Sequence, residues 1–438
     1  MATDIKKEIE KLDHRAKEIQ SLLRYASRAF VMEFSGTPKS GKTTSVEAIR
    51  QFLSRHGFRV HVLTERAAIC PIPMKGHLFF NTWCATSMLA ELLANVESET
   101  DIIIVDRGLF DALVWLTLQE KRGEVTGNEA KTIDSFLLLD RWRTLIDVPV
   151  VLNVSVEDAI DREKALHITS KGGSIMNKQV LAAIVESVNE AISRYGSKFN
   201  GVINHVTTGK RIRKSNIDLA NKILDRFERF LNPDILVVAR QEIEELPLEQ
   251  GGLYGETAVQ NVLECIKTHC CFMPRHDAEN NFEYVQIIPS AILRYRNEIF
   301  VFERKETDPK YHLFGKHTVW KGCHVSKREV ISISEMIRMA LLDRISRELF
   351  LSRIFPIKAL GYCWDADDQM SSKHLGIIYQ VEIDNSHTAL DLRKKEFRKM
   401  RGHGFTGRFV NYQKIWNLET EMALESWSLT IKNWMDKL

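Results

Sequence analysis

The chain lacks the cysteine pattern of a metal-binding or disulfide-stapled protein. Its seven cysteines are dispersed, and no two are spaced as CxxC. This odd, scattered set argues against a zinc site or a disulfide framework and favours a reducing compartment. The sequence also has no apolar run near the roughly 20 residues that span a bilayer, and its charged N-terminus is unlike a secretory signal. We therefore expect a cytoplasmic protein with no membrane partner.

An excess of one charge is missing too. The 438 residues include 61 Lys and Arg against 58 Asp and Glu, a formal net charge of +3. This balance argues against a nucleic-acid partner. One basic stretch, LRKKEFRKMRGHGFTGR at 392–408, interleaves phenylalanines with cations and could contact nucleic acid or a polyphosphate. A solvated loop is the preferred interpretation because no basic excess surrounds it.

Apolar runs and helical periodicity divide the chain into two main domains. Segment 29–232 alternates strands and helices, which predicts an α/β domain whose parallel sheet is covered on both faces, a three-layer fold. After a break at LNPD (231–234), segment 233–438 indicates an α+β domain with a helical extension from about residue 388. Expected strands are 29–34, 59–63, 102–105, 148–154 and 202–206, then 235–238, 284–288, 291–295, 299–302 and 375–382; expected helices are 43–55, 78–95, 108–120, 127–146, a helix from 157, 177–196, 216–231 and one strong later helix, 334–350.

Segment 1–28 predicts a helix with a heptad seam. Two interpretations are open: a coiled coil that makes a homo-oligomer, or a helix that lies on its own domain. The second is preferred because three heptads are the minimum for a coiled coil. The seam residues are Ile5, Ile9, Leu12, Ala16, Ile19 and Leu23.

A phosphate-binding loop follows the first expected strand. The segment 36–43 matches the pattern GxxxxGK[ST] between a strand and a helix. Its backbone N–H groups and the start of the helix suit phosphate oxygens, Lys42 suits the β- and γ-phosphates, and the Thr43 hydroxyl suits Mg²⁺. We expect ATP and Mg²⁺ as cofactors. The nucleotide-binding residues are Gly36, Thr37, Pro38, Lys39, Ser40, Gly41, Lys42, Thr43 and the adjacent Thr44.

Charged residues follow the expected strands 59–63 and 102–105 of this domain. Asp106 follows the apolar run IIIV, at the sheet edge where open α/β proteins bind ligands, and is a candidate Mg²⁺ ligand or helix cap. Arg107 suits an anionic acceptor. Glu65 ends the strand before and could accept a proton from an attacking hydroxyl, or form a surface ion pair. The catalytic candidates are therefore Lys42, Glu65, Asp106 and Arg107.

Four motifs carry a family resemblance: FSGTPKSGKTT (34–44), TER (64–66), VDRGLFDALVW (105–115) and VVLNVSVEDAIDREK (150–164). With them, segment 29–232 resembles the thymidylate kinase and deoxynucleoside kinase superfamily, and no NKxD-type motif points to a GTPase. The resemblance implies that Arg162, as a catalytic residue, and Lys164, as a nucleotide ligand, belong to a lid with Lys171 near its tip. It also implies that helix 78–95 walls the acceptor site. Glu-Arg replaces the Glu-Pro usual in deoxynucleoside kinases, so nucleoside and nucleoside monophosphate acceptors both stay open.

The second domain resembles a Nudix-type domain of a phosphoesterase branch, on ILVVARQEIEEL (235–246), FMPRHDAENNFEYVQIIPSAIL (272–293), HLFGKHTVWKGCHV (312–325) and KHLGIIYQVEI (373–383). A working Nudix helix gathers carboxylates around Mg²⁺. Here Arg344 and Arg347 stand at two of the three glutamate positions and only Glu348 remains, which argues against hydrolysis because a cation repels the metal. The two arginines could bind phosphates of a second nucleotide or pair with Asp343 and Glu348.

These observations lead to one preferred function and two rivals. The preferred function is ATP-dependent phosphoryl transfer to a nucleoside or nucleoside monophosphate, with the Nudix-like domain binding a nucleotide or regulating the kinase. The first rival is an oligomeric nucleotide sensor with slow hydrolysis, in a stress or phage response. The second is an active Nudix pyrophosphohydrolase regulated by the loop-bearing domain.

Overall fold

A computed structural model describes most of the chain and divides it into two compact units, Met1–Leu231 and Asn232–Leu438. Among the residues described, no helix has the length and apolar character needed to cross a membrane. Lys171, Trp416 and residues 392–406 lie outside the described part. The described residues are 2–26, 28–96, 100–166, 175–207, 212–303, 316–328, 332–348, 356–365, 371–383, 407–411 and 424–434.

The first unit is built on a parallel sheet of five strands in the order β2-β3-β1-β4-β5. The strands are short and largely apolar, as expected for a parallel sheet buried on both faces. Strand β1 is central, with β3 and β4 as its neighbours. The chain leaves β1 towards β2 on one side and leaves β3 towards β4 on the other, so the connections diverge at the carboxyl ends of these two adjacent strands. The strands are β1 (Phe30–Gly36), β2 (Val60–Leu63), β3 (Ile102–Asp106), β4 (Val148–Asn153) and β5 (Ile203–Val206).

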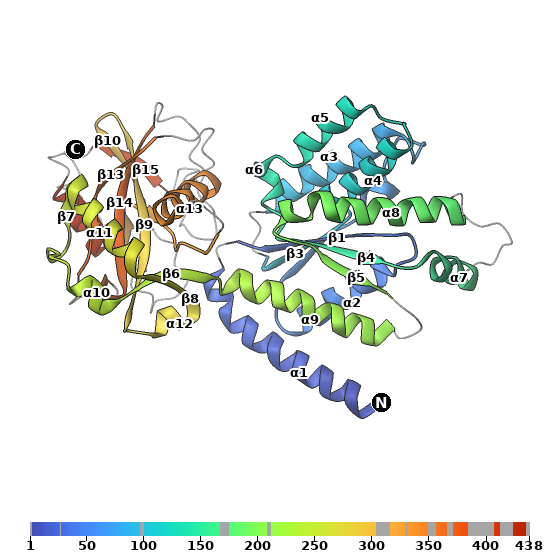
Figure 1. Cartoon of the computed structure of the whole chain (residues 1–438), viewed down its shortest axis with the longest axis horizontal. Coiled ribbons are helices and arrows are strands. Elements are labelled where there is room, and N and C mark those ends of the chain that lie inside the picture. The colour runs from blue at the N-terminus through green and yellow to red at the C-terminus, as the bar shows by residue number, and fades with distance from the viewer. Residues whose placement is uncertain are drawn as a thin grey trace. The chain divides into compact units, whose positions relative to one another are not determined.

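Helices cover both faces of this sheet (Figure 1). One hydrophobic core joins the sheet to α3, α4 and α8, and a second joins it to α1, α2 and α9. The arrangement is a three-layer α/β unit in which the loops at the carboxyl ends of the strands are left uncovered for a ligand. The helices are α1 (Ala2–Ser21), α2 (Lys42–Arg55), α3 (Leu78–Asn95), α4 (Leu109–Lys121), α5 (Gly127–Leu137), α6 (Asp140–Arg143), α7 (Val156–Leu166), α8 (Lys178–Tyr195) and α9 (Ile212–Leu231).

The N-terminal helix α1 lies on its own unit. Leu12, Ala16 and Ile19 of the heptad seam are buried in the core that α9 shares. Arg15 adds ion pairs to Asp225 at 2.5 Å and Glu228 at 2.7 Å on α9. The central part of the seam therefore packs within the chain, the arrangement that the sequence favoured.

The expected helix 127–146 is wrong in one respect, because two helices occupy that span. α5 ends at Leu137 and α6 begins at Asp140. Between them the Trp142 indole N–H donates to the Phe136 carbonyl oxygen at 2.9 Å, which satisfies an acceptor at the end of α5. A tertiary hydrogen bond of this kind leaves no trace in helical periodicity.

The second unit is a mixed α+β structure around one extended sheet. Its main path runs β11-β10-β9-β14-β13-β7, in which only the β9–β14 pair is parallel. Strand β6 pairs with β8 and β9, β12 with β9, and β15 with β10. The strands are β6 (Asp234–Ala239), β7 (Leu253–Tyr254), β8 (Cys270–Pro274), β9 (Tyr284–Tyr295), β10 (Glu298–Glu303), β11 (His317–Thr318), β12 (Lys321–Gly322), β13 (Ile357–Cys363), β14 (His374–Glu382) and β15 (Gly407–Asn411).

Helices of the second unit pack on this sheet through a large apolar core. Helix α11 joins that core through Val259, Val262 and Ile266, and the sequence analysis missed it. The spacing of these three residues, in steps of three and four, is the signal that could have predicted it. The helices are α10 (Arg240–Glu244), α11 (Glu256–His269), α12 (Arg275–Asn280), α13 (Ile333–Glu348) and α15 (Ser426–Lys432).

Two further expectations for this unit need correction. Strand β9 is one strand through Pro289, where the sequence indicated two, and the Pro289 carbonyl accepts from Cys323 N at 3.2 Å. Residues 407–411, expected to be helical, form strand β15 because they pair with β10. Trp427 and Trp434 are buried in a common core.

Candidate active site

The loop that joins β1 to α2 is anchored by strand β4. Thr37 N donates to the Leu152 carbonyl oxygen at 3.0 Å, and Val154 N donates to Thr37 Oγ1 at 3.1 Å. Gly36 is needed at the close approach: its φ is +144°, and a Cβ there would lie 2.1 Å from the Leu152 oxygen. The loop is therefore fixed by backbone contacts to the neighbouring strand.

The far end of the loop opens into α2. Gly41 has φ +89° with no atom within 4 Å of a would-be Cβ, and α2 begins at Lys42. The first N–H groups of a helix have no partner within it, and they carry its positive end. Among the described residues, the buried Ser40 Oγ also has no hydrogen-bond partner. Open space, unpaired donors and positive potential together fit a polyphosphate, and Thr43 and Thr44 are exposed beside them.

Lys42 connects the loop to the two neighbouring strand ends. Its side chain is 8% exposed, and its ammonium forms an ion pair with Asp106 at the end of β3. The same ammonium lies 3.8 Å from Glu65, just beyond β2. Three residues that the sequence assigned to catalysis are therefore brought together at one edge of the sheet.

Arg107 fixes the second carboxylate. Its Nε lies 2.9 Å from Glu65 Oε1, and its Nη1 donates to Asp111 Oδ1 at 3.0 Å. The backbone of Arg107 has φ +62°, in the left-handed region that is uncommon for residues other than glycine. Asp111 also accepts from Ser35 Oγ at 2.6 Å. The side chain of Arg107 is thus oriented by two carboxylates and held in the site.

Glu33 supports the turn between β3 and α4, and it was not among the predicted site residues. Its fully buried carboxylate accepts from the backbone N–H groups of Gly108, Phe110 and Asp111 at 2.8–3.1 Å. Burial nonetheless raises the pKa of Glu33 to about 7, against the effect of these three donors. The signal that could have found it is an acidic residue inside an otherwise apolar buried strand.

Arg162 reaches the loop from α7. Its Nη1 donates to the Lys39 carbonyl oxygen at 3.0 Å, and both Nη1 and Nη2 donate to Thr207 at 3.2 Å. Lys39 in turn pairs with Glu163 at 2.6 Å. Lys164 is exposed on the same helix. Thr207 and Glu163 were not among the expected site residues, because nothing local marks their contact with the loop.

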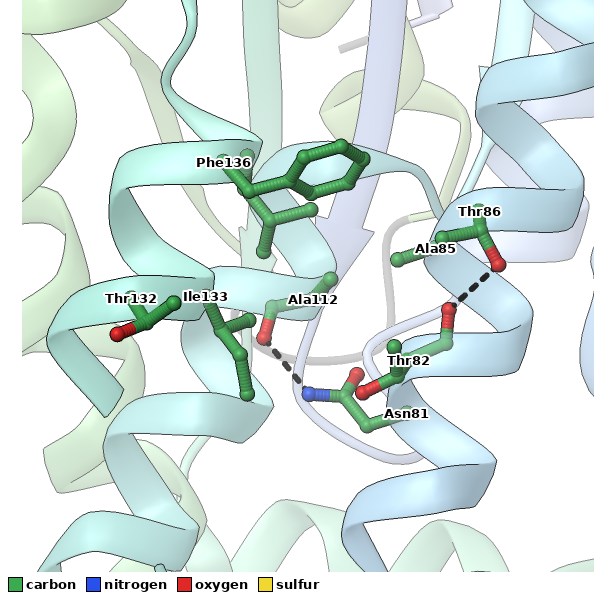
Figure 2. Close-up of a pocket in the computed structure, with 9 residues that line it drawn as sticks. Asn81, Thr82, Ala85, Thr86, Ala112, Thr132, Ile133 and Phe136 are labelled. Atoms are coloured by element: carbon green, nitrogen blue, oxygen red, sulfur yellow. Dashed lines mark hydrogen bonds between the residues drawn. The ribbon is translucent and has the colours of Figure 1, made fainter. Parts of the chain in front are cut away.

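An apolar cavity of about 330 Å³ lies between α3, α4 and α5 (Figure 2). Asn81 on α3 lies at the edge of the cavity, and its Nδ2 donates to the Ala112 carbonyl oxygen on α4 at 3.0 Å. Cys84, also on α3, has a raised pKa. Burial is the largest cause, followed by Cys70 and then by the charges of Glu65 and Asp111. The cavity is lined by Asn81, Thr82, Ala85, Thr86, Ala112, Thr132, Ile133, Phe136 and Leu137.

Helix α3 walls this cavity, but three of its aromatic residues do not line it. Phe79 is 66% exposed, and Phe80 and Trp83 are half-buried outside the lining set. The face of α3 turned to the cavity is instead small and polar, with Asn81, Thr82, Ala85 and Thr86.

In the second unit, α13 carries the residues expected at a Nudix helix. Asp343 pairs with Arg328 at 2.6 Å, a partner that the sequence analysis did not consider, and Arg344 is half-buried. Arg347 and Glu348 end this helix, beyond the residues whose side chains are described.

Comparison with known proteins gives weak likenesses. No protein-family model matches the chain. Protein YmaB of Bacillus subtilis (strain 168) is 23% identical over 199 residues, which covers 44% of this chain and 93% of that protein. The crystal structure of Tm1382, a Nudix hydrolase candidate, has 16% identity and a TM-score of 0.36, covering 47% of this chain and 99% of that chain. Deoxyadenosine kinase from M. mycoides with bound dATP has 18% identity and a TM-score of 0.34, covering 45% and 99%. Since these TM-scores are low, the functional case depends on the chain's own residues.

Proposed function

We propose that the first unit transfers the γ-phosphoryl group of ATP to a nucleoside or a nucleoside monophosphate. One observation carries the proposal: Lys42, at the end of a phosphate-binding loop, lies between Asp106 and Glu65, and Arg107 holds Glu65 in place. A cation for the phosphates, a carboxylate for a metal and a carboxylate for a proton are the groups that phosphoryl transfer requires.

Each residue then has a separate role. The loop N–H groups and Lys42 bind the triphosphate, and Arg162 stabilises the loop from which they act. Thr43 and Asp106 would hold Mg²⁺, which neutralises phosphate charge when bound. An acceptor oxygen forms a bond to the γ-phosphorus while the bond to the β-phosphate oxygen breaks, and ADP leaves. Where the acceptor is a hydroxyl, Glu65 accepts its proton.

We propose that the cavity between α3, α4 and α5 binds the nucleobase of the acceptor. A largely apolar pocket with one or two polar groups is the usual form of a small-ligand site. Asn81 supplies an amide at its wall, and the charges of Glu65 and Asp111 act on Cys84, one turn further along α3. The acceptor's reactive end would therefore lie near Glu65.

A γ-labelled ATP transfer assay against nucleosides and nucleoside monophosphates tests the proposal. We expect transfer to one acceptor class, and Lys42→Met should lower it by about 10²–10³-fold because a charge-stabilising group is removed. Glu91→Gln is the control variant. Glu91 pairs with Arg66, as Glu65 pairs with Arg107, but it belongs neither to the phosphate-binding loop nor to the cavity lining. No transfer to any acceptor, or full activity in Lys42→Met, would refute the kinase.

Glu65→Gln separates the two acceptor classes. A nucleoside hydroxyl must lose a proton, so this variant should lower transfer by about 10²-fold or more. A monophosphate oxygen is already largely ionised at neutral pH, so the same variant should then have a small effect. Lys42-dependent hydrolysis of ATP without any transfer would instead favour the nucleotide-sensor function.

For the second unit we propose nucleotide binding that localises or regulates the kinase. Its support is Arg344 on α13, half-buried where a Nudix enzyme needs a metal-binding carboxylate. Pyrophosphate cleavage that persists in Lys42→Met would contradict this assignment and favour an active hydrolase.

A further inference from the structure

Three metal-ligating side chains converge in the second unit, far from the loop residues in sequence. Glu279 lies on α12, His324 follows β12, and His374 opens β14. Each offers one ligand atom, and these atoms lie within 4.8 Å of one another. His324 Nε2 is 3.8 Å from Glu279 Oε1, and the two imidazole centroids are 6.2 Å apart.

A buried glutamine completes the cluster. Gln286 on β9 is opposite His374 in the parallel register of β9 and β14. It has no exposed surface, and its Oε1 lies 2.8 Å from His324 Nε2. An N–H at Nε2 that donates to this oxygen orients the ring and leaves Nδ1 with the lone pair for a metal. The Gln286 Nε2 has no hydrogen-bond partner among the described residues. An amide NH₂ group donates and cannot ligate a cation, so this buried donor suits a water molecule or another acceptor bound at the site.

Contacts to the backbone hold the elements of the cluster together. Lys373 donates to the Glu279 carbonyl oxygen at 3.0 Å and ties α12 to the start of β14.

The surrounding charges decide which metal fits. Arg275 Nε lies 3.5 Å from Glu279 Oε1, and Arg344 is close enough to act on His324. Mg²⁺, which prefers oxygen ligands and is held mainly by charge, is disfavoured beside two arginines and a single carboxylate. Zn²⁺ gains much of its affinity from bonds to imidazole nitrogen, and two histidines with one carboxylate are a common set for it.

We propose that Glu279, His324 and His374 form a binding site for Zn²⁺ or a similar first-row transition metal, with Gln286 positioning His324. Tetrahedral ligands with metal bonds of about 2.0–2.1 Å lie roughly 3.3 Å apart. The ligand atoms must therefore move closer by about 1 Å when the metal binds. Three protein ligands leave a position open for water or another small ligand. This proposal is independent of the kinase function.

Cobalt binding tests the site in the untagged full-length protein. Co²⁺ is titrated into wild type in excess Mg²⁺, which occupies oxygen-rich sites, and its visible absorption is followed; Zn²⁺ then displaces it. We expect one equivalent to bind, and His374→Ala and Glu279→Gln to weaken binding at least tenfold. Gln286→Leu should weaken it about 10–100-fold, as changes behind metal-binding histidines do. Arg344→Met should strengthen binding, because it removes a like charge.

His269→Ala is the matched control, since His269 lies 3.0 Å from Glu242 and belongs to no group of three metal-ligating side chains among the described residues. Its binding should equal that of wild type. Circular dichroism of each variant separates loss of the site from loss of the fold, and the opposite sign expected for Arg344→Met cannot arise from unfolding. Absence of saturable Co²⁺ binding in wild type, equal binding in all variants, or a thiolate-to-cobalt charge-transfer band that assigns the ion to cysteine would overturn the site.

Discussion

Lys42 and Asp106 form an ion pair across the carboxyl ends of β1 and β3, two strands that lie side by side in the sheet. The two side chains are 8% and 14% exposed, so water screens the pair only partly. A triphosphate bound to Lys42 would have to share or replace this contact. The pair therefore holds the lysine in place until the nucleotide arrives.

Asp106→Asn should separate the metal role of this carboxylate from its contact with Lys42. The amide keeps the shape but is a poorer Mg²⁺ ligand. We expect transfer to fall by about 10²-fold and the Mg²⁺ concentration for half-maximal rate to rise. Transfer is measured over a Mg²⁺ series, with Asp101→Asn, whose side chain pairs with Arg59 elsewhere on the sheet, as control. An unchanged Mg²⁺ dependence would remove Asp106 from the metal site.

Filling the cavity tests its assignment to the acceptor. Ala85→Leu adds volume to the lining, and an overpacking cost of about 1–3 kcal/mol in acceptor binding corresponds to a roughly 5- to 150-fold rise in the acceptor KM. The KM for ATP should stay within about twofold. Ala94→Leu, exposed on the same helix, is the control. Equal changes in both KM values would place the acceptor elsewhere.

Glu33 should make stability depend on pH. Its pKa is about 7 in the folded protein and near 4.5 when exposed, so the folded state binds more protons between these values. The free energy of unfolding should therefore decrease as pH rises from about 4.5 to 7, by about 3 kcal/mol from this residue. Urea unfolding of wild type and Glu33→Gln over this range measures the difference. Parallel curves for the two proteins would contradict the assignment.

Gly36→Ala should destabilise the first unit strongly. A Cβ would lie 2.1 Å from the Leu152 oxygen at φ +144°, so both strain and collision act, and we expect a loss above about 3 kcal/mol. Gly123→Ala is the matched control, because its φ is also positive, +68°, yet no atom lies within 4 Å of the added carbon. Thermal unfolding compares them, and equal losses would mean that the contact with β4 is unimportant.

Arg28 should be essential for stability though it is distant from the site. It binds Asp147 through both Nη atoms, with Nη1 at 2.7 Å, and its side chain is 9% exposed. Arg28→Met leaves the largely buried Asp147 carboxylate without its cation, with the Val31 N–H still donating to it, and should cost about 3–5 kcal/mol of unfolding free energy. Arg50→Met breaks an exposed pair with Glu47 and should change stability little. Equal small losses in both variants would show that Asp147 remains solvated.

The sequence predicted features that depend on neighbours along the chain. The segment 36–43 and the run Ile102–Val105 each carry their own pattern, so the loop, its flanking elements and the residues Lys42, Glu65 and Asp106 could be expected at one edge. Glu33 is marked in the sequence only as an acidic residue inside an apolar strand, because its partners, the N–H groups at the start of α4, follow β3.

Long-range convergence explains the other misses. Thr207 meets Arg162 only after β5 has joined the sheet. Glu279, His324 and His374 come from three elements and follow no motif spacing. Helix α11 is a different case, since its apolar periodicity was present in the sequence and was overlooked.

The parallel alignment of β9 with β14 sets His374 opposite Gln286. Side chains alternate between the two faces of a strand, so a slip of one residue would turn His374 away from its partners. A metal ion bound by residues of α12, β14 and the segment after β12 would therefore report on the register of β9 and β14. During refolding with Co²⁺, the visible absorption of the bound ion would return only after β9 and β14 had paired in their native register.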